Sequence, residues 1–478
     1  MSININDEQL DEVTAKANLV GIRVGLVSLG CPKNLVDSEI MLGLLEEAGC
    51  LLTANEAEAE ILIVNTCGFI GEAQQEAVNT ILELSQYKLS GPCRGLIVTG
   101  CLVQRFAKEL AGELPEVDAL LGTGEFTQIV PVIQRVLKGE KVQEVGTPLF
   151  LYSEVWPRKL STPSHYAYIK VAEGCDNCCS YCTIPEIRGG FRSRSIASIH
   201  SEVDALVHNN GVKEIILIAQ DTTRYGEDLY GTPKLAELLR HLAAIPDIYW
   251  IRWMYGYPTR ISPELIEIMA DNPKICSYVD LPLQHIDIEV LTRMNRPDDP
   301  EHIRRVISQL RTKLPDLSLR TSFIVGFPGE TEEAFLRLLD FMEEIRFDRV
   351  GAFIYSSEEG TVAAGLPGMV PEEIKSERYQ RLMECQQRIS LENNQVWVGR
   401  SVKILVEGIK ECQIFARELS SELLGYGRTC REAPEIDGLV YFRDPLKLDV
   451  SVGDFVEVTI VQADHYDLIG VVKCESTE

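Results

Sequence analysis

Residues 174–182 read GCDNCCSYC and place four cysteines, Cys175, Cys178, Cys179 and Cys182, within nine residues. The stretch divides in two ways. As CDNC followed by CSYC it forms two adjoining C-x2-C pairs, a spacing typical of zinc sites. As Cys175, Cys179 and Cys182 it reads C-x3-C-x2-C with one cysteine left over, a spacing that indicates an iron–sulfur cluster. The choice between the two decides the chemistry and the fold around this stretch.

The zinc interpretation is weakened by the distance between the two pairs. Four-cysteine zinc sites carry a loop of about 15–20 residues between their C-x2-C pairs, and here the loop has no residues. Three thiolates can instead hold three irons of a [4Fe–4S] cluster and leave the fourth iron open. The spacing is the signature of radical S-adenosylmethionine (SAM) proteins, in which that iron binds SAM and Tyr181 stands at the usual aromatic position. Cys178 is then a bystander.

The residues around this stretch, 165–395, alternate between strand and helix patterns. Such alternation predicts a parallel α/β arrangement with functional groups at the carboxyl ends of the strands. Because six strand–helix units are too few for an eight-stranded barrel, we expect a partial (α/β)6 TIM-like barrel. The six predicted strands lie at 166–174, 214–220, 249–255, 277–283, 318–329 and 349–355.

Residues 21–143 predict a separate parallel α/β domain. A short apolar strand followed by a helical pattern occurs three times, and the strands end at Cys31, Cys67 and Cys101. Since the carboxyl ends of parallel strands open on one edge of a sheet, the three thiols can converge there. Helix N-termini nearby favour thiolates. We therefore expect a second three-cysteine cluster. The preceding residues 1–20 are expected to be an acidic flexible tail, and residues 144–164, which contain three prolines, a linker.

Residues 397–470 change to short β runs separated by Gly and Asp turns, which predicts a small antiparallel β-barrel resembling an OB fold. OB folds commonly bind nucleic acid. From Trp397 to the end, however, the chain has nine Lys and Arg against fifteen Asp and Glu. This barrel is therefore expected to be a poor ligand for phosphate backbones.

Composition argues against nucleic-acid binding, a membrane span and secretion. The chain of 478 residues has a formal net charge of −26, so it repels nucleic-acid backbones and attracts basic partners, although acidity can also serve solubility alone. No apolar run approaches the ~20 residues of a membrane span, and the N-terminus lacks a secretory signal. We expect a cytoplasmic protein. In that compartment the fourteen cysteines predict metal binding or packing rather than disulfides.

These motifs together resemble the radical SAM methylthiotransferases over nearly the whole chain. The matching segments are SLGCPKN, NTCGFI, TGCLVQR, GCDNCCSYCTIP, LPLQH, SFIVGFPGETEEAF and the C-terminal β module. The resemblance implies an N-terminal cluster domain, a radical SAM core and a TRAM domain. It further implies that Cys31, Cys67 and Cys101 bind an auxiliary [4Fe–4S] cluster. The resemblance also implies that Cys175, Cys179 and Cys182 bind the radical SAM [4Fe–4S] cluster.

The family has one branch that acts on tRNA adenosine and another that acts on an aspartate of the twelfth protein of the small ribosomal subunit. The stretch IAQDTTRYGEDLYG, with Asp221, Thr222 and Thr223, resembles the ribosomal-protein branch. That branch implies methylthiolation of the aspartate β-carbon, with one SAM as methyl donor, a second as radical source, a sulfur donor, and an electron donor such as a flavodoxin or ferredoxin.

Two other interpretations stay open at this point. One is the tRNA branch, which the acidic barrel disfavours, and the other is a non-catalytic iron–sulfur factor that binds ribosomes. The residues expected to contact SAM, besides those that hold the cluster, are Tyr181, Gly326, Gly329 and Glu330.

Overall fold

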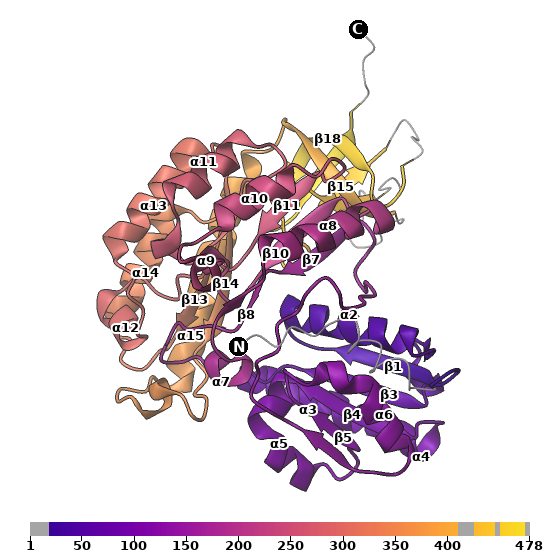
Figure 1. Ribbon diagram of the computed structural model, residues 1–478. Coiled ribbons are helices and arrows are strands. Elements are labelled where there is room, and N and C mark those ends of the chain that lie inside the picture. Colours follow the sequence, from indigo (N-terminus) through magenta and orange to yellow (C-terminus); the bar gives the residue numbers. More distant parts are fainter. Residues whose placement is uncertain (1–18, 410–424, 445–449, 474–478) are drawn as a thin grey trace, which may run out of the picture.

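The computed structural model describes residues 19–409, 425–444 and 450–473. Three bodies follow one another along the chain, and Figure 1 shows the first and the last at opposite ends of the middle one. Most of the predicted acidic tail, residues 1–18, lies outside the described residues. Within the described part, no helix is long and apolar enough to cross a membrane.

The N-terminal domain is a six-stranded parallel sheet in the order β2-β1-β3-β4-β5-β6. Alternate residues of β3 and β4 enter different apolar clusters, so both faces of the sheet are covered, as is usual for parallel sheets. Its elements are β1 (Arg23–Ser28), α2 (Pro32–Glu47), β2 (Leu51–Leu52), β3 (Ile61–Thr66), α3 (Gly71–Ser85), α4 (Tyr87–Ser90), β4 (Gly95–Gly100), α5 (Cys101–Glu113), β5 (Ala119–Leu121), α6 (Ile129–Leu137) and β6 (Val142–Glu144).

The core has the six parallel strands expected from the sequence. Two parallel sheets, β11-β10-β7 and β12-β13-β14, meet where Ile251 bridges to Ile275, which gives an open partial barrel. The helices cover its outside (Figure 1). The strands are β7 (Tyr166–Lys170), β8 (Ala172–Glu173), β9 (Arg192–Ser193), β10 (Glu214–Ile218), β11 (Trp250–Trp253), β12 (Tyr278–Asp280), β13 (Ser318–Val325) and β14 (Arg349–Ile354). The helices are α7 (Ile184–Arg188), α8 (Ile196–Asn210), α9 (Glu227–Tyr230), α10 (Leu235–Ala243), α11 (Pro263–Asp271), α12 (Ile288–Arg293), α13 (Pro300–Lys313), α14 (Glu332–Ile345) and α15 (Glu372–Gln395).

The C-terminal body is a closed five-stranded barrel in the order β15-β16-β17-β19-β18. Four of its strand pairs are antiparallel, but β17 and β19 pair in parallel. That parallel pair departs from the purely antiparallel expectation, because the chain crosses the barrel through β18 before β19 closes it. The strands are β15 (Ser401–Ile409), β16 (Gly425–Arg428), β17 (Val440–Arg443), β18 (Phe455–Ala463) and β19 (Leu468–Val472).

The stretch between the first two bodies has no helix or strand from residue 145 to residue 164, yet it is packed. Tyr152 and Trp156 are buried. Arg158, also buried, donates to Glu39 on α2 at 2.7 Å and to Glu202 on α8 at 2.6 Å. Because removing one partner of a buried ion pair is costly, this segment fixes the N-terminal domain against the core.

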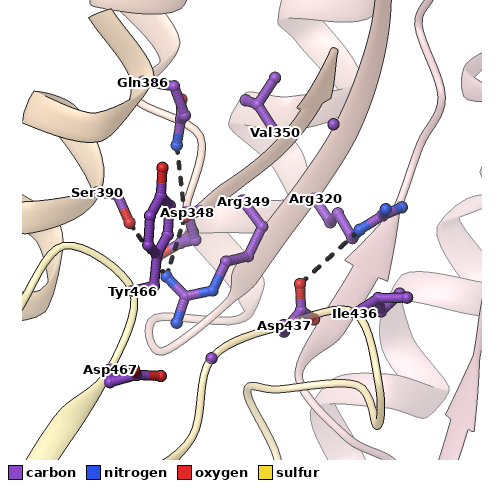
Figure 2. A pocket seen from close by; sticks show the side chains of 12 residues that line it. Arg320, Asp348, Arg349, Val350, Gln386, Ser390, Ile436, Asp437, Tyr466 and Asp467 are labelled. Carbon is purple, nitrogen blue, oxygen red and sulfur yellow. Dashed lines mark hydrogen bonds and ion pairs between the residues drawn. The ribbon is translucent and has the colours of Figure 1, made fainter. Parts of the chain in front are cut away.

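The C-terminal barrel is attached at the amino ends of the core strands. Glu214, the first residue of β10, is fully buried and accepts from Arg252 at 2.9 Å and from Arg428 of the barrel at 2.8 Å. A pocket of ≈ 360 Å³ lies beside this junction, where Arg320 and Arg349 of the core face Asp437 and Asp467 of the barrel (Figure 2). This end of the strands is opposite the one that carries the cysteine loop.

Candidate functional site

The first cysteine set lies in a loop that follows β8. Cys175 is buried, and Cys179 and Cys182 are partly buried. Backbone N–H groups of Asn177 and Ile184 donate to the sulfurs of Cys175 and Cys182, each at 3.4 Å. Burial raises the pKa of Cys175 to about 11 and that of Cys182 to about 12. Sulfurs that are buried and receive N–H hydrogen bonds suit an iron–sulfur cluster, whose metal ionises such thiols on binding.

Cys178 differs from its neighbours because its side chain is exposed. A single zinc ion would need all four sulfurs around one point. Among the described residues, no three His, Cys, Asp or Glu side chains are grouped closely enough to hold one metal ion. A cubane cluster does not need such a group, since each thiolate binds a different iron. The exposed side chain of Cys178 agrees with the three-cysteine interpretation, and both the ligand set and the bystander role of Cys178 stay predictions.

The second cysteine set lies at one edge of the N-terminal sheet. Cys31, Cys67 and Cys101 follow β1, β3 and β4, which are neighbours in the sheet. Gly30, at φ +88°, lets two of the three loops touch, because a Cβ there would lie 2.8 Å from the Cβ of Cys67. Cys31 is the N-cap residue of α2, and its side chain makes no capping hydrogen bond to the helix. Burial raises the pKa of Cys101 to about 12.

One arginine joins the two cysteine sets. Arg188 belongs to α7, directly after the Cys175–Cys182 loop, and it is buried. It reaches into the N-terminal domain, where it bonds to Asn34 Oδ1 and to Asp37 at 2.7 Å, and its Nη2 lies 3.7 Å from Cys101 Sγ. Asn34 in turn donates to the carbonyls of Leu29 and Thr66, at the ends of two strands. The two cysteine sets are therefore held in a fixed relation.

A second junction lies on the other side of this edge. Glu358, in the loop after β14, is buried and accepts from the Gly71 N–H at the start of α3 at 2.9 Å, from Gln74 at 2.8 Å and from Arg105 at 3.0 Å. Arg105 also donates to the carbonyl of Gly68, next to Cys67, at 2.6 Å. This carboxylate therefore ties the core to the cysteine loop of the N-terminal domain.

Replacing Glu358 with alanine is expected to loosen this junction. Breaking a buried ion pair costs about 3 kcal/mol, so hydrogen exchange of the Gly71 amide should accelerate on the order of 100-fold. Glu359→Ala is the matched control, because its neighbouring side chain is exposed. Equal exchange rates in both variants would show that Glu358 does not hold the two domains together.

The residues expected to contact SAM lie on the core side. Tyr181 packs edge-to-face on Phe327, with ring centroids 6.3 Å apart. Gly326 and Gly329 both have positive φ, and a Cβ on Gly326 would lie 2.3 Å from Lys375. The carboxylate of Glu330 accepts from the Gly326 N–H at 2.8 Å and from Arg378 at 2.8 Å. Glu330 thus shapes the turn, and SAM contact by these four residues stays a prediction.

Glu330 makes stability depend on pH. Burial raises its pKa from 4.5 to about 7, against the pull of Arg378 and two backbone N–H donors. Between these two values the folded chain holds a proton that the unfolded chain has lost, so stability falls as pH rises through about 7. From about pH 5.5 to about pH 8 we expect the wild type to lose roughly 2 kcal/mol relative to Glu330→Gln. Thermal unfolding of both proteins checks this, with Glu332→Gln as the exposed control; parallel pH curves would contradict it.

The three residues of the branch motif are buried and bonded within the chain. Asp221 accepts from Asn177, inside the cysteine loop, at 2.9 Å and from Arg260 at 2.7 Å. The hydroxyl of Thr223 donates to Asp221, and that of Thr222 donates to the carbonyl of Met254. In this arrangement the motif anchors the loop of the core cysteines to β10 and β11.

Asn34, Arg188 and Glu358 were not predicted from the sequence. Asn34 lies three residues after Cys31 in CPKN, so its proximity to a cysteine was the available signal. Arg188 and Glu358 carried no signal, because their partners are 154 and 287 residues away along the chain.

Each of the three bodies matches a known protein family or domain. Residues 23–122 match the model described as Uncharacterized protein family UPF0004, residues 169–342 match the Radical SAM superfamily, and residues 398–472 match the TRAM domain. A radical SAM methyltransferase from Kitasatospora setae, TsrM, has a similar fold, with a TM-score of 0.52 and 14% identity over 70% of this chain and 75% of its own. The fold and the family matches define a radical SAM enzyme with an additional N-terminal α/β domain.

Curated relatives narrow this class. The ribosomal protein uS12 methylthiotransferase RimO of Heliobacterium modesticaldum is 53% identical over 95% of both chains. That of Desulforamulus reducens is 53% identical over 94% of this chain and 98% of its own. The chain belongs to the RimO family of radical SAM methylthiotransferases.

Proposed function

We propose that this enzyme attaches a methylthio group to the β-carbon of an aspartate in ribosomal protein uS12. The single observation that carries the proposal is the contact of Arg188 with Asn34 and Cys101, because it places the two cysteine sets at one domain junction. Relatives that are about half identical over nearly the full chain are named ribosomal protein uS12 methylthiotransferases, which supports the substrate protein and the group transferred. The proposal covers the target residue and the use of two SAM molecules.

The residues present fit two [4Fe–4S] clusters. Cys175, Cys179 and Cys182 would hold one; all three are buried or partly buried, and the sulfurs of Cys175 and Cys182 receive backbone N–H groups. Cys31, Cys67 and Cys101 would hold the other. When bound, the clusters and SAM supply the electron, the radical and the methylthio group. An electron donor such as a flavodoxin or ferredoxin and a sulfur donor complete the reaction.

The chain itself contributes position and shielding. The Asp221–Asn177 bond holds the core cysteine loop, and Arg188 and Glu358 fix the N-terminal domain against it. No side-chain base removes a hydrogen from an unactivated carbon near neutral pH, so the reaction needs a radical. A rigid junction is needed as well, because a misplacement of about 1 Å can cost on the order of 100-fold in rate.

The acidic C-terminal barrel fits a basic protein substrate. It is attached at the amino ends of the core strands, whereas the core cysteines follow the carboxyl ends. A substrate protein held by the barrel would therefore extend a segment along the open side of the core toward the cysteines. The negative charge of the barrel favours a basic ribosomal protein over tRNA as the substrate.

Side-by-side assays test the proposal. The cluster-loaded enzyme is incubated with SAM, reductant and either uS12 or tRNA, and mass spectrometry follows the products. We expect one added methylthio group on one aspartate of uS12 and none on tRNA. Modification of tRNA alone would place the chain with the adenosine-modifying enzymes. An absence of 5′-deoxyadenosine under anaerobic conditions would mean that the chain only binds the ribosome.

A further inference from the structure

Lys33 is a buried lysine whose ammonium group makes no direct contact with a carboxylate among the described residues. It lies two residues after Cys31 in the first turn of α2, and only 7% of it is exposed. Its Nζ sits 3.1 Å from the ring centroid of Tyr255, which belongs to the core. Among the residues that the structure describes, none makes a hydrogen bond or ion pair with this ammonium group. A buried charge without a partner is costly, so the arrangement calls for a ligand.

The nearby carboxylates are engaged by other cations. Asp280 accepts from Arg320 at 2.9 Å and from the Tyr255 N–H at 3.0 Å. Glu173 pairs with Lys170 at 2.7 Å and lies 3.4 Å from Arg188. In the described part of the chain, the ammonium group of Lys33 makes no hydrogen bond with these carboxylates, although it has three donors.

The ring beneath Lys33 is held in a strained position. Tyr255 has φ +64°, which is uncommon for a side chain of its size. Its N–H donates to Asp280 and its carbonyl accepts from the Thr222 N–H at 2.9 Å, so the peptide groups on both sides of Tyr255 are held by hydrogen bonds. Strain of this kind persists where the surrounding structure overrides it and is concentrated at functional sites. The ring attracts an ammonium group without neutralising it.

We propose that Lys33 binds the side-chain carboxylate of the substrate aspartate. The assignment rests on the proposed function and adds a residue that selects the substrate. Lys33 follows Cys31 by two residues and contacts Tyr255 of the core, so it lies at the junction of the two cysteine-bearing domains, where the proposed function requires the reacting carbon to arrive. Charge-assisted hydrogen bonds to a carboxylate are stronger than neutral ones. Lys33 therefore favours aspartate over asparagine, whose amide has no charge.

A double-mutant cycle tests the assignment. Two peptides that carry the target segment of uS12, one with the aspartate and one with asparagine in its place, are titrated into the cluster-loaded wild type and Lys33→Met. We expect the wild type to bind the aspartate peptide on the order of 10–100-fold more tightly. Lys33→Met should bind both peptides equally and weakly while it keeps its iron and still forms 5′-deoxyadenosine. Lys108→Met, an exposed lysine on α5, is the control and should keep the wild-type preference.

An aspartate preference that is the same in Lys33→Met and in wild type would overturn the assignment. Loss of iron from the N-terminal domain with that preference unchanged would also overturn it, because the ammonium group would then serve the cluster. Failure of the proposed function is a separate result, seen as wild-type enzyme that transfers no methylthio group to uS12.

Discussion

Cys101→Ser is expected to abolish methylthio transfer while the enzyme continues to cleave SAM. Cys101 is the buried member of the N-terminal set and the first residue of α5, so serine keeps the shape and removes a soft ligand. About four of about eight irons should be lost, corresponding to one cluster. Formation of 5′-deoxyadenosine should stay within a fewfold of wild type, because Cys175, Cys179 and Cys182 are intact.

Iron analysis, product mass spectrometry and 5′-deoxyadenosine measurement on one anaerobic sample check this expectation. Cys93→Ser is the matched control, since Cys93 is also buried in the N-terminal domain but its sulfur donates to the carbonyl of Gly95. If Cys101→Ser still transferred sulfur, the N-terminal cysteines would not hold the cluster that supplies it.

Cys179→Ser and Cys178→Ser should have opposite effects although the residues are neighbours. Loss of Cys179 removes one of three ligands of the core cluster, so formation of 5′-deoxyadenosine and methylthio transfer should both fall to background. Cys178 is exposed, and Cys178→Ser should leave the iron content and both activities unchanged. The pair is informative because each variant controls for the effect of the other on the loop.

Electron paramagnetic resonance of the reduced proteins and a zinc determination complete this experiment. Loss of the core cluster signal is expected in Cys179→Ser alone. Stoichiometric zinc in the wild type that is lost equally in both variants would instead support a zinc site formed by the two C-x2-C pairs.

Much of the fold could be predicted because it depends on local patterns. β3 and β4 are apolar runs that each end one residue before a cysteine, and a run of this kind followed by a helix is typical of a parallel sheet. Six core strands and the barrel strands were predicted in the same way. The parallel pairing of β17 with β19 was not, since their order in the barrel depends on closure rather than on either strand.

Cysteine spacing and the position of a residue at a strand end are local properties, so the amino-acid sequence alone predicts which cysteines hold clusters. How the two sets are joined, and what lies between them, depends on the packing of the domains. Arg188 meets Cys101, Glu358 meets Gly71, and Lys33 lies over Tyr255. The first pair is 87 positions apart along the chain, the second 287, and Lys33 and Tyr255 are about 220 apart. No local sequence pattern encodes pairs at such separations. The packing of separate domains creates them, since it alone brings distant charges within a few ångströms.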